Sequence, residues 1–256
     1  MQKISLVVIT KNEEKNIARC LSSVTFASEK IVVDSHSTDA TQKIAEANGA
    51  KVVLKEFKGY REQKEFACSQ ASNHWILILD ADEALSPQLS DELQFLLKQD
   101  LKADAFDLPR RTFHLGKWIR YGGWHPDYQR RLFNKNVVSW ASQELHENLI
   151  AKNVVRLQHP ILHWGFVDLK HQIETNNRYS TMGALELKRQ GKRFSLIKLI
   201  SKPWGKFLEC YFFKLGILDG LPGFVIAVGA AYSMFLKWAK LWELNAASSD
   251  SKRDSL

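Results

Sequence analysis

Cysteine is scarce in this chain of 256 residues, and Cys20, Cys68 and Cys210 do not have the spacing of metal ligands. A disulfide framework is therefore not expected, and a reducing compartment fits the composition. The N-terminal stretch MQKISLVVITKNEE has only a short apolar run that leads into charge, so it is not typical of a signal peptide. Internal repeats are lacking, and the low-complexity tail at residues 246–256 is expected to be disordered.

A glycine-rich phosphate loop is also missing. The first apolar run is followed by TKNEE, where a dinucleotide-binding protein would carry G-x-G-x-x-G. A nucleotidyltransferase on a similar sheet, an alternative for this chain, would normally carry glycines with Lys or Arg at this point. Thr10 and Glu13 have the spacing of a helix capping box, so a purely structural role for both is one interpretation.

The composition permits a folded protein with an anionic partner. Apolar residues make up 45% of the chain, which is enough for a substantial core. The net charge of +8 favours a nucleotide, a nucleic acid or an acidic membrane surface as partner. No RNA- or DNA-binding motif accompanies the charge, so nucleic acid is not expected.

Strand-like and helix-like segments alternate through the first hundred residues. Strands are expected at 3–10, 29–35, 50–56 and 74–80, and helices at 13–24, 39–49 and 60–72. This alternation predicts an α/β fold with a parallel sheet and right-handed crossovers. Ligands of such sheets bind at the carboxyl ends of the strands.

Acidic residues gather at those predicted strand ends. Asp34 ends the second strand, and Asp80, Asp82 and Glu83 follow the apolar run WILIL. Neighbouring carboxylates repel one another, so they need positive surroundings. A helix N-terminus together with solvent could provide such surroundings, and so could a metal ion together with a phosphate. Asp80 and Asp82 form a D-x-D, which is a weak signal alone but stronger at the end of a fourth strand.

These motifs resemble a known family. SLVVITKNEEKNIARCLSSV, IVVDSHSTDAT and WILILDADE are similar, in order and spacing, to the nucleotide-sugar half of the family 2 glycosyltransferases. FHLGKWIRYGGWHPDYQRRLF, QELHENL and ILHWGF resemble a narrower group, the bacterial lipopolysaccharide core glycosyltransferases that add β-1,4-linked glucose. The resemblance implies a GT-A fold, which is a Rossmann-like, mostly parallel sheet flanked by helices, with a helical C-terminal extension.

The resemblance also implies roles for individual residues. Thr10, Glu13, Asp34 and Lys64 are expected to surround the uridine of a UDP-sugar, with Asp80 at the ribose. Asp82 is expected to bind Mg²⁺ or Mn²⁺, which would stabilise the leaving UDP. Some GT-A enzymes complete the metal shell with a downstream histidine, a role open to His163. The alternative for His163 is a hydrogen-bonded histidine of the core.

An inverting transfer needs a base that takes the acceptor proton. Glu147 is preferred narrowly over Glu144, and both lie on one face if their segment is helical. A solvated helix face without catalytic function is the alternative for both. Asp127 is a further candidate, because aromatic residues on which a sugar could stack surround it in the sequence.

Several cations lie in the expected acceptor-binding segment. A surface role in solubility is one interpretation, and contact with the carboxylates or phosphates of an acidic glycolipid is the other. They are Arg110, Arg111, Lys117, Arg120, Arg130 and Arg131.

The C-terminal part predicts a membrane contact. Residues 221–236 carry no charge and are followed by Lys237, Trp238, Lys240 and Trp242, a pattern of membrane interfaces. The run is shorter than the roughly 20 residues of a transmembrane helix, so we expect it to lie on the membrane. We expect a catalytic domain at 1–175, a helical membrane-associating region at 176–245 and the tail at 246–256.

The sequence as a whole predicts a metal-dependent inverting hexosyltransferase. It would transfer a hexose, glucose in the first instance, from a UDP-sugar to the lipid-anchored inner core of lipopolysaccharide. It would act as a peripheral protein at the cytoplasmic face of the bacterial inner membrane. A family 2 transferase acting on another lipid-linked or protein acceptor and a non-enzymatic basic membrane-binding module are the remaining alternatives.

Overall fold

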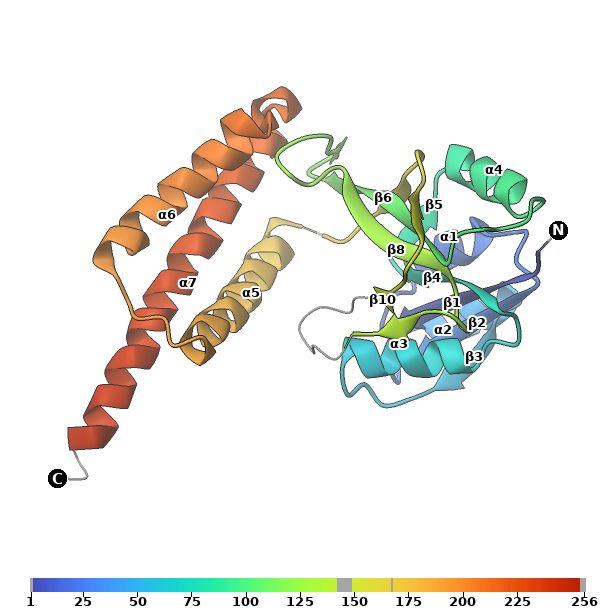
Figure 1. The fold of residues 1–256 in the computed structure, drawn as a ribbon, viewed down its shortest axis with the longest axis horizontal. Coiled ribbons are helices and arrows are strands. Elements are labelled where there is room, and N and C mark those ends of the chain that lie inside the picture. The colour runs from blue at the N-terminus through green and yellow to red at the C-terminus, as the bar shows by residue number, and fades with distance from the viewer. Residues whose placement is uncertain (1, 142–148, 167, 254–256) are drawn as a thin grey trace. The chain divides into compact units, whose positions relative to one another are not determined.

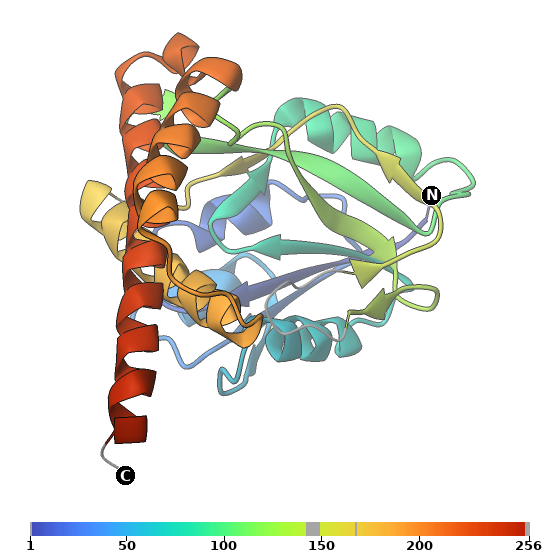
Figure 2. The ribbon, with the colours of Figure 1, turned by 60° about the vertical axis from the view of Figure 1, so that its left-hand side comes forward.

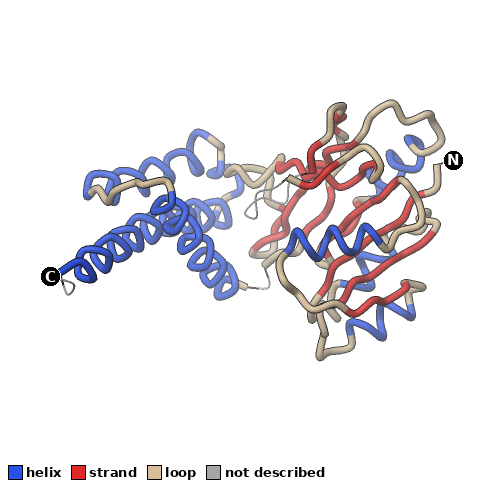
Figure 3. Tube along the Cα trace, turned by 60° about the horizontal axis from the view of Figure 1, so that its bottom comes forward, coloured by secondary structure: helices blue, strands red, loops and turns tan. Residues whose placement is uncertain are grey.

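A computed structural model describes residues 2–141, 149–166 and 168–253, with only the backbone for 247–253 (Figure 1). The chain divides into two compact units. The sheet unit comprises residues 1–111 and 126–165, and the helical unit comprises residues 112–125 and 166–256. Figure 3 shows that the helical unit is built mainly of helices, whereas the sheet unit holds the long strands.

Four parallel strands form the first part of the sheet. They are β1 (Ile4–Thr10), β2 (Glu29–Asp34), β3 (Lys51–Leu54) and β4 (Trp75–Asp80), in the spatial order β3-β2-β1-β4. Every residue of β1 is buried, as expected for a parallel strand covered on both faces.

The sheet continues beyond β4 in an antiparallel manner. The next strands in space are β8 (Asp127–Asn134), β6 (Ala105–His114), β12 (Ile161–His163) and β5 (Glu83–Leu85). Both β4 and β6 pair antiparallel with β8. The short strands are β7 (Lys117–Trp118) and β11 (Val154–Arg156), which pair with β6, and the pair β9 (Ser139–Trp140) and β10 (Leu149–Ile150).

Helices cover both faces of the sheet. Helices α1 (Ile17–Ser22), α2 (Thr41–Ala47) and α4 (Pro87–Leu96) contribute to one apolar cluster with the even-numbered residues of β1. Helix α3 (Tyr60–Ser69) contributes to a second cluster with the odd-numbered ones. All seven elements expected in the first eighty residues are present. The capping box at Thr10 is wrong, because Thr10 lies within β1 and the N-cap of α1 is Asn16.

The helical unit is a bundle of three long helices (Figure 2). Helix α7 (Leu221–Arg253) packs against both α5 (Leu169–Arg189) and α6 (Leu196–Leu208). A π-helical turn, Glu209–Phe213, and a 3₁₀ turn, Gly216–Asp219, connect α6 to α7. The unit includes residues 112–125, and its second segment begins at Phe166, whereas the sequence placed the boundary at residue 176.

Residues 112–125 belong to the helical unit because Asp219 holds them. Its buried carboxylate accepts hydrogen bonds from the backbone N–H groups of Arg120 (3.0 Å) and Tyr121 (2.8 Å). The Lys117 ammonium donates to the backbone carbonyl of Asp219 at 3.0 Å. Lys117 therefore has a structural contact where the sequence suggested an acceptor contact.

Helix α7 is long and apolar. Its segment Leu221–Ala246 would suffice to cross a membrane by length and composition. Pro222 lies in the first turn, where a missing N–H does no harm, so the helix is not interrupted.

The start of α7 depends on a close backbone approach. A Cβ added to Gly223 would lie 1.9 Å from the carbonyl oxygen of Gly216. We expect Gly223→Ala to destabilise the helical unit by about 1–3 kcal/mol, because the backbones must separate. Gly205→Ala is the matched control, since a Cβ there meets nothing within 4 Å. Circular dichroism melting should show a lower midpoint for Gly223→Ala than for the parent and no decrease for Gly205→Ala. Equal midpoints for the two variants would contradict this packing.

Candidate active site

The parallel register brings the predicted residues to one edge of the sheet. Thr10, the last residue of β1, is directly opposite Asp34, the last residue of β2. On the other side of β1, Ile9 is opposite Asp80, the last residue of β4. Three strand ends therefore present polar side chains at the same carboxyl edge, where ligands of such sheets bind.

Asp34 is completely buried and fully hydrogen-bonded. Its Oδ1 accepts from the backbone N–H of Ser37 (2.8 Å) and from the side chain of Gln42 (2.9 Å). Its Oδ2 accepts from the Ser37 hydroxyl at 2.5 Å. The loop after β2 is joined to the loop after β1, because Asn12 donates its N–H to Ser37 Oγ at 2.8 Å. Asp34 thus braces the two loops that border the edge.

Thr10 has an unsatisfied hydroxyl. Its Oγ1 is buried and has no hydrogen-bond partner among the described residues. A buried hydroxyl without a partner is costly, which favours a ligand group nearby. Glu13, in the loop that follows, accepts from the Asn16 side chain at 2.7 Å.

Asp80 lies between two buried cations. Lys64, from α3, is 3.2 Å from its Oδ1, and Arg131, from β8, is 2.5 Å from its Oδ2. Burial alone would raise the pKa of Asp80, but the charges of Arg131 and Lys64 outweigh it and hold the pKa below its usual range. The stability from these pairs is complete above the ordinary carboxyl pKa of about 3.9. It is lost as the pH falls from there towards the lowered value.

Glu83 shares the same arginine. The guanidinium of Arg131 lies 2.7 Å from the Glu83 carboxylate. The same carboxylate accepts a hydrogen bond from the Arg110 guanidinium at 3.3 Å. The Glu83 side chain is 0% exposed. Burial tends to lower the pKa of Arg131, but Asp80 and Glu83 raise it overall. Arg131 is therefore an internal counter-ion, and its buried side chain fits neither of the two alternatives from the sequence, a surface role in solubility or contact with the acceptor.

Asp82 and His163 form a second pair, with side-chain exposures of 23% and 15%. Asp82 lies in the turn after β4, so it does not share an extended segment with Asp80. His163 Nε2 is 3.3 Å from Asp82 Oδ2. The pair forms because Glu83, the next residue, is directly opposite His163 in the β5–β12 ladder. Trp164 also donates its N–H to the Asp82 carbonyl at 2.9 Å.

This pair has the chemistry and spacing of metal ligands. Two ligand atoms about 2.1 Å from one ion, at right angles, are about 3.0 Å apart. Carboxylate and imidazole together suit Mn²⁺. Asp82 and His163 therefore fit as two protein ligands, with the remaining positions left to phosphate oxygens and water. Within the described residues, no third His, Cys, Asp or Glu joins them.

Neighbouring residues restrict this pair. A Cβ at Gly165 would lie 2.2 Å from Cε1 and 2.4 Å from Nε2 of His163, so only glycine leaves room for the ring. The Arg19 guanidinium stacks 3.4 Å from the centre of the Trp164 ring. Burial lowers the pKa of Arg19, and the charge of Asp82 opposes this effect.

The candidate bases are placed differently from one another. Glu144 and Glu147 lie outside the described residues. Asp127 begins β8, directly opposite Arg110 in β6. Its Oδ2 accepts two hydrogen bonds from Arg110, at 2.6 Å and 3.0 Å, and its Oδ1 accepts one from Gln129 at 2.8 Å.

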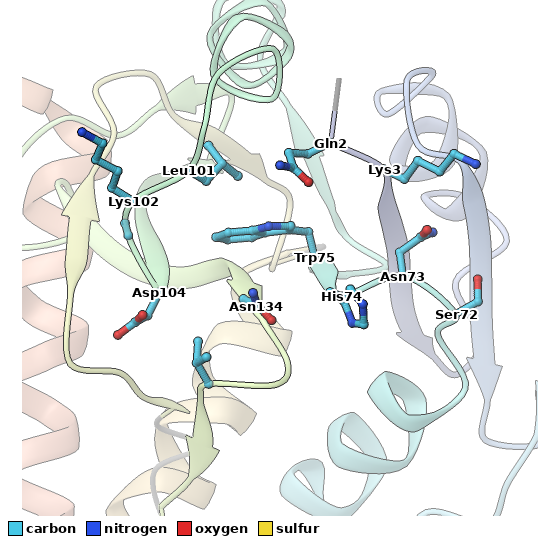
Figure 4. A pocket seen from close by; sticks show the side chains of 12 residues that line it. Gln2, Lys3, Ser72, Asn73, His74, Trp75, Leu101, Lys102, Asp104 and Asn134 are labelled. Carbon is cyan, nitrogen blue, oxygen red and sulfur yellow. The ribbon is translucent and has the colours of Figure 1, made fainter.

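A cavity of about 660 Å³ lies elsewhere in the sheet unit (Figure 4). It is lined by residues at the amino ends of β1 and β4, including Lys3, His74 and Trp75. None of the predicted site residues lines it. The candidate active site is therefore identified by strand ends and charge, and not by this cavity.

The contributions of Glu83, Arg131, Arg19 and Trp164 to this edge were not anticipated. Glu83 was visible as one of three clustered acids, and Arg131 as one of several cations. Their pairing joins residues 48 positions apart in the chain. No sequence spacing encodes such a contact, because it depends on β8 lying beside β4.

Comparison with known proteins agrees with this geometry. The glycosyl transferase family 2 profile matches residues 5–147. An uncharacterized glycosyltransferase of Rickettsia typhi is 34% identical over 97% of this chain and 89% of its own length. The lipopolysaccharide core biosynthesis glycosyltransferase LpsC of Rhizobium meliloti is 30% identical over 95% of this chain and 93% of its own length.

A solved structure shares the fold. A mannosyltransferase from Pyrobaculum calidifontis, in complex with GDP-Man and Mn²⁺, aligns with 93% of this chain and 86% of its own. The TM-score is 0.54 at 14% identity. The sheet, with its acids at the carboxyl edge, is thus that of the GT-A glycosyltransferases. The chain belongs to glycosyl transferase family 2.

Arg131 should be essential for the stability of this edge. We expect Arg131→Met to lower the free energy of unfolding by about 3–5 kcal/mol, because it leaves the Glu83 carboxylate buried without its main counter-ion. Arg130→Met is the matched control, since Arg130 pairs with Asp107 at a side-chain exposure of 26%. Its loss should cost about 1 kcal/mol or less. Urea unfolding followed by tryptophan fluorescence measures both, and similar losses for the two variants would refute the central role of Arg131.

Proposed function

We propose that the protein is an inverting, metal-dependent hexosyltransferase. It transfers a hexose, glucose in the first instance, from a UDP-sugar to the inner core of lipopolysaccharide. The observation that carries the proposal is the convergence of Thr10, Asp34 and Asp80 at one sheet edge, beside the Asp82–His163 pair. Asp80 and Glu83 at this edge already have buried counter-ions. The edge therefore suits a nucleoside diphosphate that arrives with a divalent cation.

The nucleoside would bind between the first two strands and α3. Thr10 would use its unsatisfied hydroxyl for the uracil, with Glu13 and Asp34 around it. Lys64 and Asp80 already form an ion pair at the adjacent position. Asp80 would accept a ribose hydroxyl while Lys64 and Arg131 keep it ionised.

Asp82 and His163 would hold the divalent cation, Mg²⁺ or Mn²⁺. When bound, it would supply Lewis acidity to the diphosphate of the leaving group. The mannosyltransferase that shares the fold was solved with Mn²⁺. Arg19 and Trp164 would keep Asp82 in place, because Trp164 binds its carbonyl and Arg19 covers Trp164.

The transfer itself needs a base on the acceptor side. In an inverting step the acceptor oxygen forms a bond to the anomeric carbon while the bond from that carbon to the UDP oxygen breaks. The electron pair leaves with UDP, and the acceptor proton passes to a carboxylate. We assign this carboxylate to Glu147, with Glu144 as the neighbouring candidate. Asp127 is a weaker choice, because Arg110 and Gln129 already occupy both of its oxygens.

The acceptor assignment is supported by the similarity to LpsC, which extends over nearly the whole chain. A lipid-anchored core is confined to a membrane, so we place the enzyme at the cytoplasmic face of the inner membrane as a peripheral protein. The basic net charge favours an anionic surface there.

The metal assignment predicts a loss of ligand-induced stabilisation. In the parent protein, UDP with Mn²⁺ should raise the melting temperature, because ligands that bind only the native state stabilise it. Asp82→Asn should remove most of this rise and most of the turnover. Gly165→Ala should have the same effect although it removes no ligand atom, since its Cβ displaces the His163 ring. UDP with Mn²⁺ stabilising both variants as well as the parent would defeat the assignment.

The base assignment predicts a loss of transfer without a loss of donor binding. Glu147→Gln should reduce the transfer rate by roughly 10²–10⁴-fold. Stabilisation by UDP with Mn²⁺ should remain, because a base in this role acts on the acceptor and not on the donor. If Glu144→Gln shows this pattern in place of Glu147→Gln, the role belongs to Glu144. Normal transfer by both variants would return the role to Asp127.

The overall proposal is tested by incubating the purified protein with radiolabelled nucleotide sugars and truncated lipopolysaccharide cores. Transfer of glucose from UDP-glucose to the inner core is the expected result. Transfer only from another nucleotide, or only to another acceptor, would overturn the specific assignment.

A further inference from the structure

The helical unit exposes two rows of large apolar side chains. Successive members of a row lie mostly three or four residues apart, with one adjacent pair in α6 and one gap of seven residues in α7, which places each row along one face of its helix. The row on α6 comprises Leu196, Ile197, Ile200, Trp204 and Leu208. The row on α7 comprises Leu221, Phe224, Val228, Tyr232, Phe235 and Trp242, over a length of about 30 Å.

Both rows point to the same side of the helix pair. Helices α6 and α7 run antiparallel, side by side (Figures 1 and 2). The residues of α6 that contact α7 include Leu199 and Phe207, and those of α7 that contact α6 include Trp238 and Phe224. In each helix the exposed row lies further around the axis, in the direction of the chain, than the contact row, by about 90° in α6 and about 50° in α7. Rotations of the same sense in two antiparallel helices point to the same side, so the rows form one surface, the α6–α7 apolar face.

The lysines of α6, and those of α7 up to residue 246, point away from this face, and Glu243 of α7 lies at its margin. Lys198, Lys202 and Lys206 of α6 lie at positions on the other side of that helix. On α7, Lys240 points instead to α5, where its ammonium contacts the Ser180 hydroxyl at 2.8 Å and Thr181 Oγ1 at 2.7 Å. Two neighbouring rows of exposed apolar side chains of this length are unusual for a protein in water.

The charge of the chain lies in the same unit. The helical unit has 16 Lys and Arg against 8 Asp and Glu, whereas the sheet unit has 20 of each. The whole net charge of +8 is therefore carried by the unit with the apolar face. Four exposed cations lie at the α5–α6 corner, where they could meet lipid headgroups. They are Lys188, Arg189, Lys192 and Arg193.

We propose that the α6–α7 apolar face inserts into one leaflet of an anionic membrane, with both helices parallel to the membrane plane. The proposal rests on the proposed function, in which the acceptor is lipid-anchored, and it specifies the surface that docks. Apolar insertion and the attraction of the basic unit to anionic headgroups act together. Two copies of this chain would instead bring two units of the same positive charge together, which disfavours a dimer through this face.

Helix α7 does not cross the membrane in this arrangement, although its length and composition would allow it. Another face of α7 is matched to α5 by polar contacts. The Asn176 side chain of α5 donates to the carbonyl of Gly229 at 3.3 Å, and Lys240 contacts the Asn177 carbonyl at 2.8 Å. A spanning α7 would abandon these contacts and place Lys237 and Lys240 in hydrocarbon, which is costly.

The test uses the full chain and vesicles of phosphatidylethanolamine with phosphatidylglycerol. Trp204→Glu and Val228→Glu place a charge on the α6 row and on the α7 row. Phe95→Glu in α4 is the matched control, because Phe95 is exposed to 66% and Trp204 to 68%. Both face variants should bind vesicles at least about tenfold more weakly than the parent, and the control should bind equally well. Binding by the parent should weaken with salt without vanishing, because apolar insertion is not screened.

Two further measurements separate the explanations. Stabilisation by UDP with Mn²⁺ should be unchanged in all three variants, which shows that they are folded. Vesicle binding needs neither donor nor acceptor, so it can be measured even if no transferase activity is found. Sedimentation velocity without lipid should give a monomer. Vesicle binding by the face variants equal to that of the parent, or a stable dimer that Trp204→Glu dissociates, would overturn the proposal.

The orientation of α7 is tested in membranes. A protease-cleavable tag after residue 256 should be removed from inverted inner-membrane vesicles, whose outer surface is the cytoplasmic face, without detergent. A tag that is protected until the vesicles are opened would show that α7 spans the membrane, which would also overturn the proposal.

Discussion

The candidate site depends on one buried cation, the guanidinium of Arg131. It lies within 2.5 Å of the Asp80 carboxylate and 2.7 Å of Glu83, in a region where unpaired charge is strongly destabilising. Without it, the buried carboxylate of Glu83 and the half-buried carboxylate of Asp80 would lose their shared counter-ion. With it, Asp80 stays ionised and fixed at the edge of the sheet. The acids at this edge therefore divide into Asp80 and Glu83, which are neutralised by cations of the protein, and Asp82, which is paired with His163.

The change from parallel to antiparallel pairing at β4 makes this arrangement possible. Parallel strands β1, β2 and β4 deliver Thr10, Asp34 and Asp80 to the same edge. Strand β8 returns in the opposite direction beside β4, so its arginine approaches the same edge from the other side. The β5–β12 ladder adds His163 next to Asp82 in the same way. Each part of the site is thus fixed by strand register, which the apolar residues of the two core layers determine.

The two units differ in charge and in surface character. The sheet unit is electrically balanced and carries the strand-end acids, whereas the helical unit carries the net charge and the apolar face. The net charge of the whole chain does not show this difference between the units. Its physical consequence is that attraction to an anionic surface acts on the helical unit.

The sequence by itself determined the alternation of strands and helices in the first eighty residues, because apolar periodicity and strand-end acids are local signals. It also determined that Thr10, Asp34 and Asp80 would lie at one edge, since the carboxyl ends of parallel strands share an edge of the sheet. The charge partners of Asp80 and Glu83, the pairing of Asp82 with His163, and the boundary of the helical unit were decided only by the tertiary structure. Each of these joins distant segments, and a cation in a sequence looks the same whether it faces water or a buried carboxylate.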